Sequence, residues 1–521
     1  MFEDWIHRLP SRLHLIIATI GSLLAAAAFG VALGEGDFYT IYATLLGVGV
    51  AALMMVLGDK YWLVIPFAYS CDLPAIPIKG KLVELTEITA LVCSLTFFVR
   101  YALRKQTLTL FRPIHFPVLL YFAWAAFIFF KNPVGLADIS SSEGGGGRNY
   151  VKIAMALAIF VIIANQKIGS RECKWILLLV LIGSFFATAK EILIYFMPNR
   201  RGTNLATDID SYYSWHQALA NIPMIATILL FSRYPAREIF SLRKLWIFPV
   251  FAFSILVILL SGKRSAVIVL PLWATAAAFY RKEWSFLTLW VVGAVVGGAM
   301  IVVGHGSLFH LPLVAQRAVS WLPGQWDPEL QGFAGGGDDF RKTLRTLALE
   351  KIKLDPWIGT GFKMDRSLLY RIQTSGMGGM EEQVAPYALG SAWHNTWLGY
   401  AADFGIPAAL IAAAIYATYM ALAYRIFRRA PAESFIQVLT LYILLNSTRD
   451  LAFTHISGHS ALDAFSRWWL YGTLISIGLS LTAARPRVDE PPAAAPRRKS
   501  ETGHAYRERR ALRPAILPTG P

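Results

Sequence analysis

Stretches of about 20 apolar residues recur along most of the chain, and short polar or basic loops separate them. An α-helix needs about 20 such residues to cross the hydrocarbon core of a bilayer. Of the 521 residues, 55% are hydrophobic and 16% are charged. A typical soluble domain carries about 25% charged residues. The sequence therefore predicts an all-α polytopic membrane protein.

Thirteen segments have the length and composition of a membrane span, and a weaker one, 61–73, contains Pro66. The predicted spans are 13–34, 38–57, 84–101, 114–131, 151–165, 174–197, 214–231, 245–260, 264–280, 284–303, 395–424, 434–449 and 466–484. Segment 61–73 would make fourteen spans, whereas merged or interfacial segments would reduce the number to twelve. Either number places both termini on the same side.

Basic residues are concentrated in alternate loops and in the C-terminal tail, which predicts that those loops, the tail and both termini are cytoplasmic. The net charge of +16 is therefore interpreted as setting orientation and contacting anionic membrane lipids. It is not interpreted as a sign of nucleic-acid binding.

The spans and loops divide the chain into four predicted parts. These are N-terminal membrane helices at 1–303, a large outer loop at 304–393, C-terminal membrane helices at 394–484, and a basic, disordered tail at 485–521. Within the loop, Gly335–Gly337 predict a hinge, followed by a helix that starts near Phe340 and carries an apolar stripe of Phe340, Leu344, Leu347 and Leu354. Residues 355–362 predict an ordered turn.

Several cations and a histidine fall on the predicted outer face, against the positive-inside tendency: Lys263, Arg264, Arg341, Arg345 and His394. Arginines suit a phosphate-bearing substrate, and a histidine at a helix start suits proton transfer. Each has a plainer interpretation. Lys263 could be a snorkelling side chain, the two loop arginines a solvated helix face, and His394 an interfacial residue bonded to a neighbour.

Other charged residues on this face give weaker indications. Lys81 and Arg148 could bind lipid head groups or a second substrate. Asp208 and Asp210 could bind a divalent cation, although helix capping is the favoured interpretation, so no metal site is predicted. Arg449 with Asp450, and Asp463 with Arg467, predict ion pairs near the outer surface.

The order of several motifs is more specific than any one of them. A hairpin, Gly262-Lys263-Arg264-Ser265, lies two spans before the large loop. The loop contains a helix with arginine near its start, then Pro356-Trp357-Ile358-Gly359-Thr360-Gly361, and closes with His394-Asn395-Thr396-Trp397-Leu398 and Gly405-Ile406. In this order and spacing, the chain resembles the O-antigen ligase and O-antigen polymerase superfamily of bacterial envelopes.

The resemblance implies a GT-C-like, inverting glycosyltransferase of the bacterial inner membrane, with its active site facing the periplasm. Its donor would be O-antigen on undecaprenyl diphosphate, and its acceptor a sugar hydroxyl of lipid A–core. The resemblance implies that His394 is the general base and that Arg264 and Arg341 bind the diphosphate. Arg345, Lys81, Arg148 and Lys263 are further candidates for substrate binding. It also implies no metal or other cofactor, and a monomer is expected.

Three alternatives remain open. An O-antigen polymerase would use the same donor and extend another lipid-linked glycan, and a protein O-oligosaccharyltransferase would use a protein hydroxyl. The single late histidine loop favours the ligase. A transporter or flippase of an anionic lipid would instead place charges within its spans and show repeat symmetry. Few charges lie within the predicted spans, Lys190 and Glu191 being an exception, and no repeat is evident.

Overall fold

A computed structural model describes residues 57–71, 76–78, 81–109, 112–134, 146–196, 219–240, 245–363, 384, 387–388, 393, 395–453 and 460–483. Contacts between residues of the chain divide the molecule into two compact units, Met1–Ser480 and Leu481–Pro521. The first unit holds nearly all of the described residues. The predicted spans 13–34 and, except for its last residue, 38–57, together with Asp208, Asp210, His394 and the tail from 485, lie outside them.

The described part of the chain is almost entirely helical. Its first half contains η1 (Gly58–Leu63), α4 (Val64–Cys71), α5 (Leu85–Ala102), η2 (Pro113–His115), α6 (Phe116–Lys131), α7 (Gly147–Ala164), α8 (Ser170–Phe196), α10 (Asn221–Arg233), α11 (Ala236–Ile239) and α12 (Ile247–Leu260). Its second half contains α13 (Arg264–Arg281), α14 (Trp284–Gly304), α15 (Leu313–Val319), α16 (Pro328–Leu354), α19 (Thr396–Arg429), α20 (Phe435–Phe453) and α21 (Ser460–Ala483). Two short antiparallel strands, β1 (Ile76–Ile78) and β2 (Lys81–Val83), precede α5.

Among the described residues, six helices are long and apolar enough to cross a membrane: α5, α6 with η2, α7, α8, α14 and α19. Each predicted span in the described ranges overlaps a helix. The prediction of an all-α polytopic membrane protein is therefore confirmed. The total of twelve to fourteen spans stays a prediction.

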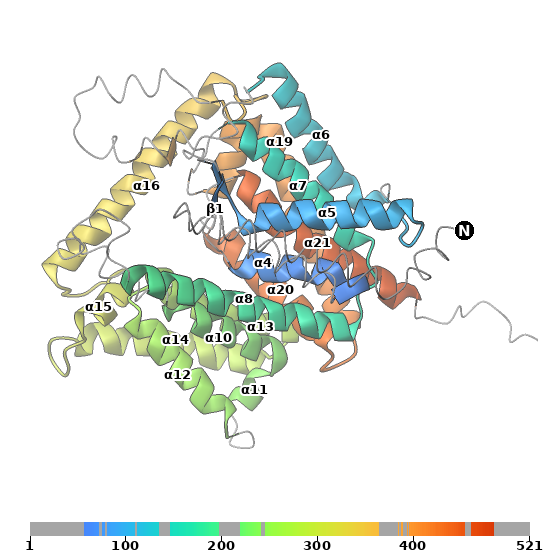
Figure 1. The fold of residues 1–521 in the computed structure, drawn as a ribbon. Coiled ribbons are helices and arrows are strands. Elements are labelled where there is room, and N and C mark those ends of the chain that lie inside the picture. The colour runs from blue at the N-terminus through green and yellow to red at the C-terminus, as the bar shows by residue number, and fades with distance from the viewer. Residues whose placement is uncertain are drawn as a thin grey trace, which may run out of the picture. The chain divides into compact units, whose positions relative to one another are not determined.

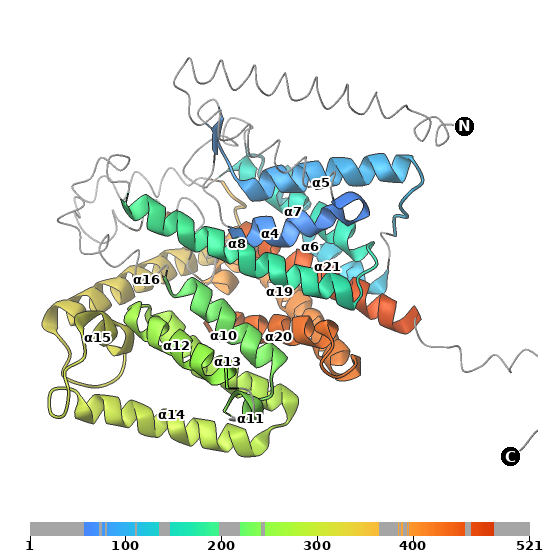
Figure 2. The same ribbon diagram turned by 60° about the horizontal axis from the view of Figure 1, so that its bottom comes forward.

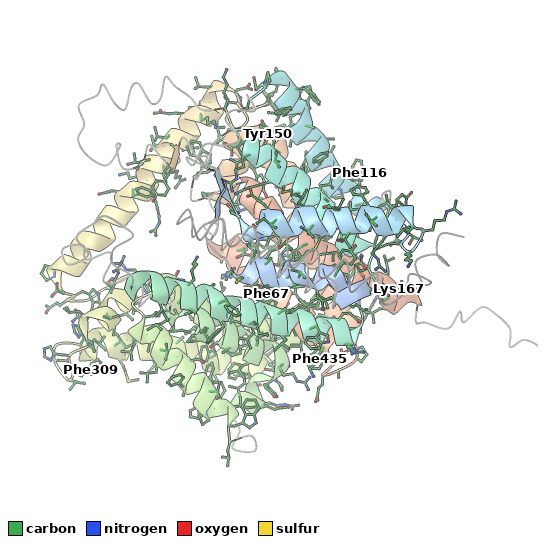
Figure 3. The ribbon with its side chains drawn as sticks, viewed as in Figure 1. Phe67, Phe116, Tyr150, Lys167, Phe309 and Phe435 are labelled. Carbon is green, nitrogen blue, oxygen red and sulfur yellow. The ribbon has the colours of Figure 1, made fainter. Side chains whose placement is uncertain are left out.

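Helix α20 forms the centre of the described bundle, where it contacts α8, α10, α13 and α19 (Figures 1 and 2). Its residues Leu439, Leu441 and Ile443 are fully buried, as expected for a helix with neighbours on several sides. By contrast, α14 packs against α13, and no residue of its apolar window is buried. Phe116 on α6 is also largely exposed, at 62% (Figure 3). Such apolar surface on a membrane protein faces lipid.

Helix α16 lies beside α15 at one end and contacts α19 towards its other end (Figure 1). It is continuous from Pro328 to Leu354, so the predicted hinge at Gly335–Gly337 and the predicted start near Phe340 are wrong. A proline begins this helix, and proline is favoured in a first helical turn. The helical backbone bonds continue through the glycines despite a cost of about 1 kcal/mol for each relative to alanine.

Candidate functional site

Helix α19 contains a sharp break at Gly405, whose φ of 78° lies in the left-handed region, followed by Pro407. The break frees backbone groups that a continuous helix would pair. The turn at 355–362 satisfies two of them. Gly361 donates its N–H to the carbonyl of Asp403 at 2.7 Å, and Ile406 donates to the carbonyl of Pro356 at 2.8 Å. The predicted turn is confirmed, and its role is to complete the broken helix.

Glycine is required on both sides of this contact. Gly359 has a φ of +72°, and a Cβ there would lie 2.6 Å from the carbonyl oxygen of Asp403. A Cβ on Gly405 would collide with the carbonyl group of Trp357. The two backbones approach too closely for any side chain, which explains why glycine occurs in both segments of the sequence.

A buried ion pair joins α16 to the same break. Lys351 Nζ lies 3.1 Å from Asp403 Oδ1, and the Asp403 side chain is 0% exposed. Trp393 donates its indole N–H to the same Oδ1 at 3.2 Å, and Lys351 lies 5.2 Å from the centre of the Trp393 ring. The carboxylate of Asp403 therefore connects the loop helix, the end of the loop and α19.

Both neighbours of position 394 in the chain are held in place. Trp393 is bonded to Asp403, and the Asn395 side chain caps α19 by accepting from the backbone N–H groups of Trp397 and Leu398, each at 3.1 Å. An asparagine at this position satisfies orphan donors of the first helical turn. His394 itself lies outside the described residues.

The apolar side of α16 packs against the end of the loop. Leu344 and Ala348 form a buried cluster with Val384, Ala388, Trp393 and Ala402, and Phe340 and Leu347 pack against it. Three residues of the predicted stripe are thus confirmed, whereas Leu354 is 74% exposed because it lies at the helix end. Arg341 and Arg345 are on the exposed side of α16.

The hairpin between α12 and α13 carries the other predicted cations. Gly262, at a φ of +68°, turns the chain closely against Val314. Arg264 then donates from Nε to the carbonyl of Arg317 on α15 at 3.1 Å. Helix α15 also contacts α16, so it bridges the elements that carry Arg264 and Arg341.

Lys263 lies next to a second group of cations. Its Nζ donates to Asn221 Oδ1 at 3.1 Å. Burial, and then the nearby charge of Arg449, lower the pKa of Lys263 below its usual value. Arg449 also lies 6.0 Å from the centre of the Trp273 ring.

Arg449 and Arg467 share one carboxylate. Asp450, with a side chain only 2% exposed, forms an ion pair with Arg449 at 2.9 Å and a second with Arg467. The predicted pair of Arg449 and Asp450 is therefore confirmed, and Arg467 joins it; the Asp463 side chain is outside the description. We call Lys263, Arg449 and Arg467 the inner cations. With one aspartate among them, they retain net positive charge in a partly buried place.

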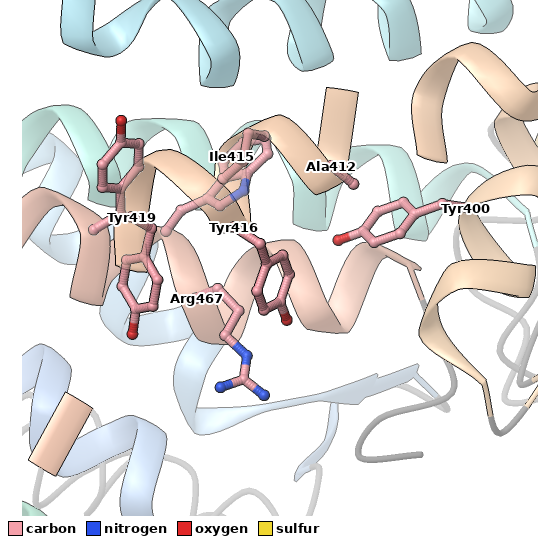
Figure 4. Close-up of a pocket in the computed structure, with 8 residues that line it drawn as sticks. Tyr400, Ala412, Ile415, Tyr416, Tyr419 and Arg467 are labelled. Carbon is pink, nitrogen blue, oxygen red and sulfur yellow. The ribbon is translucent and has the colours of Figure 1, made fainter. Parts of the chain in front are cut away.

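An aromatic cluster connects the inner cations to the beginning of α19. Arg449 lies near Tyr416, whose ring lies 5.3 Å from that of Trp397, three residues after His394. Tyr400, Tyr416 and Arg467 line a narrow pocket with Tyr419, Trp468 and Tyr471 (Figure 4). The Arg467 guanidinium and the Tyr416 hydroxyl point the same way in this view. The cavity, about 10 Å³, has room for one water molecule at most.

Arg148 occupies a different environment. It forms a bidentate ion pair with Glu87, at 2.9 and 2.8 Å. Beside it, Lys152 Nζ lies 2.7 Å from Glu84 Oε1. Burial raises the pKa of Glu84, but Lys152 and Arg148 outweigh it and the pKa is lowered overall. The Lys81 side chain is not described. Arg148 as a substrate ligand stays a prediction, and its described contacts are structural.

The arrangement combines the start of α19, capped by Asn395, with several cations in partly buried positions. Such a site can hold an anion out of water and lower the cost of charge that develops on it. Sequence reasoning missed Lys351, because a lysine in an amphipathic helix looks solvated until a buried partner is known. It interpreted Arg449 and Arg467 only as ion-pair residues. The proximity of Arg449 to Lys263 depends on the packing of α20 against α13.

These features define a multi-pass membrane protein in which several cations lie near the break in α19. Residues 249–413 match the family described as O-Antigen ligase. This match over part of the chain agrees with the resemblance seen in the motifs. The matched residues include Arg264, Arg341, His394 and the break at Gly405. A comparison with curated proteins found no match.

Proposed function

We propose that this protein is an inverting, metal-independent glycosyltransferase that moves O-antigen from undecaprenyl diphosphate to a sugar hydroxyl of lipid A–core. The observation that carries the proposal is that both chain neighbours of His394 are anchored, Trp393 by its hydrogen bond to Asp403 and Asn395 by capping α19. The site combines the capped start of α19 with cations that can bind a diphosphate. The proposed site faces the periplasm of the bacterial inner membrane.

In the proposed reaction, His394 accepts the proton of the acceptor hydroxyl as that oxygen attacks the anomeric carbon. A new glycosidic bond forms while the bond from the anomeric carbon to the diphosphate oxygen breaks from the opposite face. Undecaprenyl diphosphate leaves with the bonding electrons, and the anomeric configuration inverts. A position at a helix N-terminus favours neutral histidine, which is the form that can accept a proton.

Arg264 and Arg341 are proposed to bind the diphosphate of the donor. Its leaving oxygen gains negative charge during the reaction, so fixed donors nearby stabilise the transition state more than the bound substrate. Arg264 is supported by its half-buried place and its bond to α15. Arg341, on the exposed side of α16, would contact a donor that lies between α16 and the membrane helices.

The test uses the purified full-length protein in nanodiscs containing EDTA. Undecaprenyl-diphosphate-linked glycan is supplied with and without lipid A–core. We expect transfer only with lipid A–core, no transfer by His394→Ala, and transfer lowered by about 10²–10³ in Arg264→Ala. His310→Ala is the matched control, because it removes an exposed histidine of the same loop.

The outcomes separate the alternatives. Elongation of the donor without lipid A–core would identify a polymerase, and transfer to a protein hydroxyl would identify a protein O-oligosaccharyltransferase. Donor binding without transfer to any acceptor would favour a transporter. Full activity of His394→Ala would exclude the proposed base.

A further inference from the structure

A second polar cavity lies at the other end of α13. Arg264 begins this helix and Arg281 ends it, so the two lie at opposite ends of an 18-residue helix about 27 Å long. The cavity has a volume of about 340 Å³ and lies where the α10–α11, α13–α14 and α19–α20 connections meet. The loop charges predict that this end faces the cytoplasm. It is therefore distinct from the site beside α19.

Four arginines and three glutamates line this cavity, which leaves one net positive charge. They are Arg233, Arg237, Arg281, Arg428, Glu238, Glu283 and Glu433. Within the described part of the chain, no ion pair joins Arg237, Arg281 or Arg428 to a carboxylate. Arg281 binds the carbonyls of Phe231 and Ser232 at 3.2 and 2.7 Å, while its buried Nε has no hydrogen-bond partner.

Part of the lining is already engaged within the protein. Glu283 accepts the backbone N–H of Ala236 at 3.0 Å, and Arg233 donates to the carbonyl of Glu433. Arg233 also lies 5.8 Å from the centre of the Phe435 ring. Arg237 and Arg428 are exposed at the cavity, so they are the arginines that a ligand can reach.

The surroundings of the cavity are those of a membrane interface. Trp246, which is 56% exposed, packs against the lining residue Tyr234 with ring centres 5.9 Å apart. Trp284, which is 54% exposed, follows the lining residue Glu283 directly. Exposed tryptophans are typical of the depth of lipid head groups. The exposed apolar surface of α12 and α14 begins beside them, where acyl chains would lie.

We propose that this cavity binds the phosphodiester of an anionic phospholipid head group, with Arg237 and Arg428 as its principal ligands. One phosphodiester balances the net charge of the lining, as in phosphatidylglycerol. A zwitterionic head group would bring its own cation and leave the excess uncompensated. The apolar surface beside the cavity favours a lipid over free phosphate, because it can hold the acyl chains. The proposal is independent of the glycosyl transfer reaction.

The experiment measures lipid binding to the delipidated full-length protein in detergent by native mass spectrometry and by thermal unfolding. The probes are phosphatidylglycerol, phosphatidylethanolamine and inorganic phosphate. We expect phosphatidylglycerol to bind with the highest affinity and to raise the unfolding temperature. Arg237→Gln and Arg428→Gln should each weaken that binding by roughly fivefold, since a basic residue near anionic lipid contributes a modest, additive attraction.

Arg429→Gln is the matched control. It makes the same change of charge on the adjacent exposed residue of α19, which does not line the cavity. Unchanged binding in Arg429→Gln, with losses in Arg237→Gln and Arg428→Gln, would support the site. Equal losses in all three variants would overturn it in favour of diffuse attraction. Equal binding of phosphatidylethanolamine, or equal stabilisation by inorganic phosphate, would overturn an anionic lipid as the ligand.

Discussion

Lys351 on α16 and Asp403 on α19 form an ion pair at 3.1 Å whose carboxylate is completely buried. The pair lies at the break in α19, where the turn at 355–362 also binds. It therefore decides how the loop is attached to the membrane helices. Several testable consequences concern this attachment and the charged groups around it.

Replacement of Lys351 by methionine should destabilise the protein strongly. It would leave the Asp403 carboxylate buried without its cation, and removing one partner of a buried pair costs about 3–5 kcal/mol. Thermal unfolding in detergent measures the effect. Lys353→Met is the control, since Lys353 is exposed on the same helix, and about 0.5 kcal/mol or less is expected there. Equal effects of the two variants would mean that the pair contributes little.

Alanine at Gly405 should separate the loop from α19. Its Cβ would collide with the Trp357 carbonyl, and the φ of +78° would be strained by about 1–3 kcal/mol in addition. We expect a lower unfolding temperature and faster proteolysis of the loop. Gly297→Ala on α14, where a Cβ meets nothing within 4 Å, should be neutral or slightly stabilising. Proteolysis of Gly405→Ala at the wild-type rate would argue against the observed contact.

Lys263 should destabilise the unliganded protein at neutral pH. Its folded-state pKa is lowered, first by burial and then by Arg449, so the unfolded chain binds the proton more tightly. The penalty is present at neutral pH and is relieved as the pH rises from the folded-state pKa towards the usual value of 10.5.

Thermal unfolding of Lys263→Met against pH tests this sign. The variant should be more stable than the wild type at pH 7, and the difference should shrink in alkaline buffer. Asn221→Ala, which removes the hydrogen-bond acceptor of Lys263 but keeps the charge, should not show that pattern. A difference that grows with pH would contradict the argument.

The group around Glu84 should make the protein sensitive to acid. The pKa of Glu84 is lowered overall by Lys152 and Arg148, despite the opposing effect of burial. Its stabilising contribution is therefore present above the usual value of 4.5 and is lost as the pH falls through the lower folded-state pKa. Glu84→Gln should flatten this part of the stability profile. Glu350→Gln, on the exposed side of α16, should leave the profile unchanged.

The sequence by itself determined the helical membrane architecture, because in lipid a long apolar segment can pair its own backbone N–H and C=O groups only by forming an α-helix. It also predicted the turn at 355–362 and most of the apolar stripe of α16, which depend on local composition and periodicity. It predicted the wrong start for α16, because the low helix propensity of Gly335–Gly337 suggested a break, whereas α16 continues through them. The roles of His394, Arg264 and Arg341 stay predictions, because they depend on a bound substrate. In addition, His394 lies outside the residues that the structure describes.

Only the tertiary structure decided which charges meet. Nothing local to Lys351 indicates a carboxylate 52 positions later, and nothing local to Lys263 indicates Arg449 on another helix. Both relationships arise where helices pack and exclude water. There, the pairing and the pKa of a charged side chain depend on the residue that it faces on the neighbouring helix. The sequence determined that cations are present, and the packing of α16, α13 and α20 decided which are solvated and which are brought together beside α19.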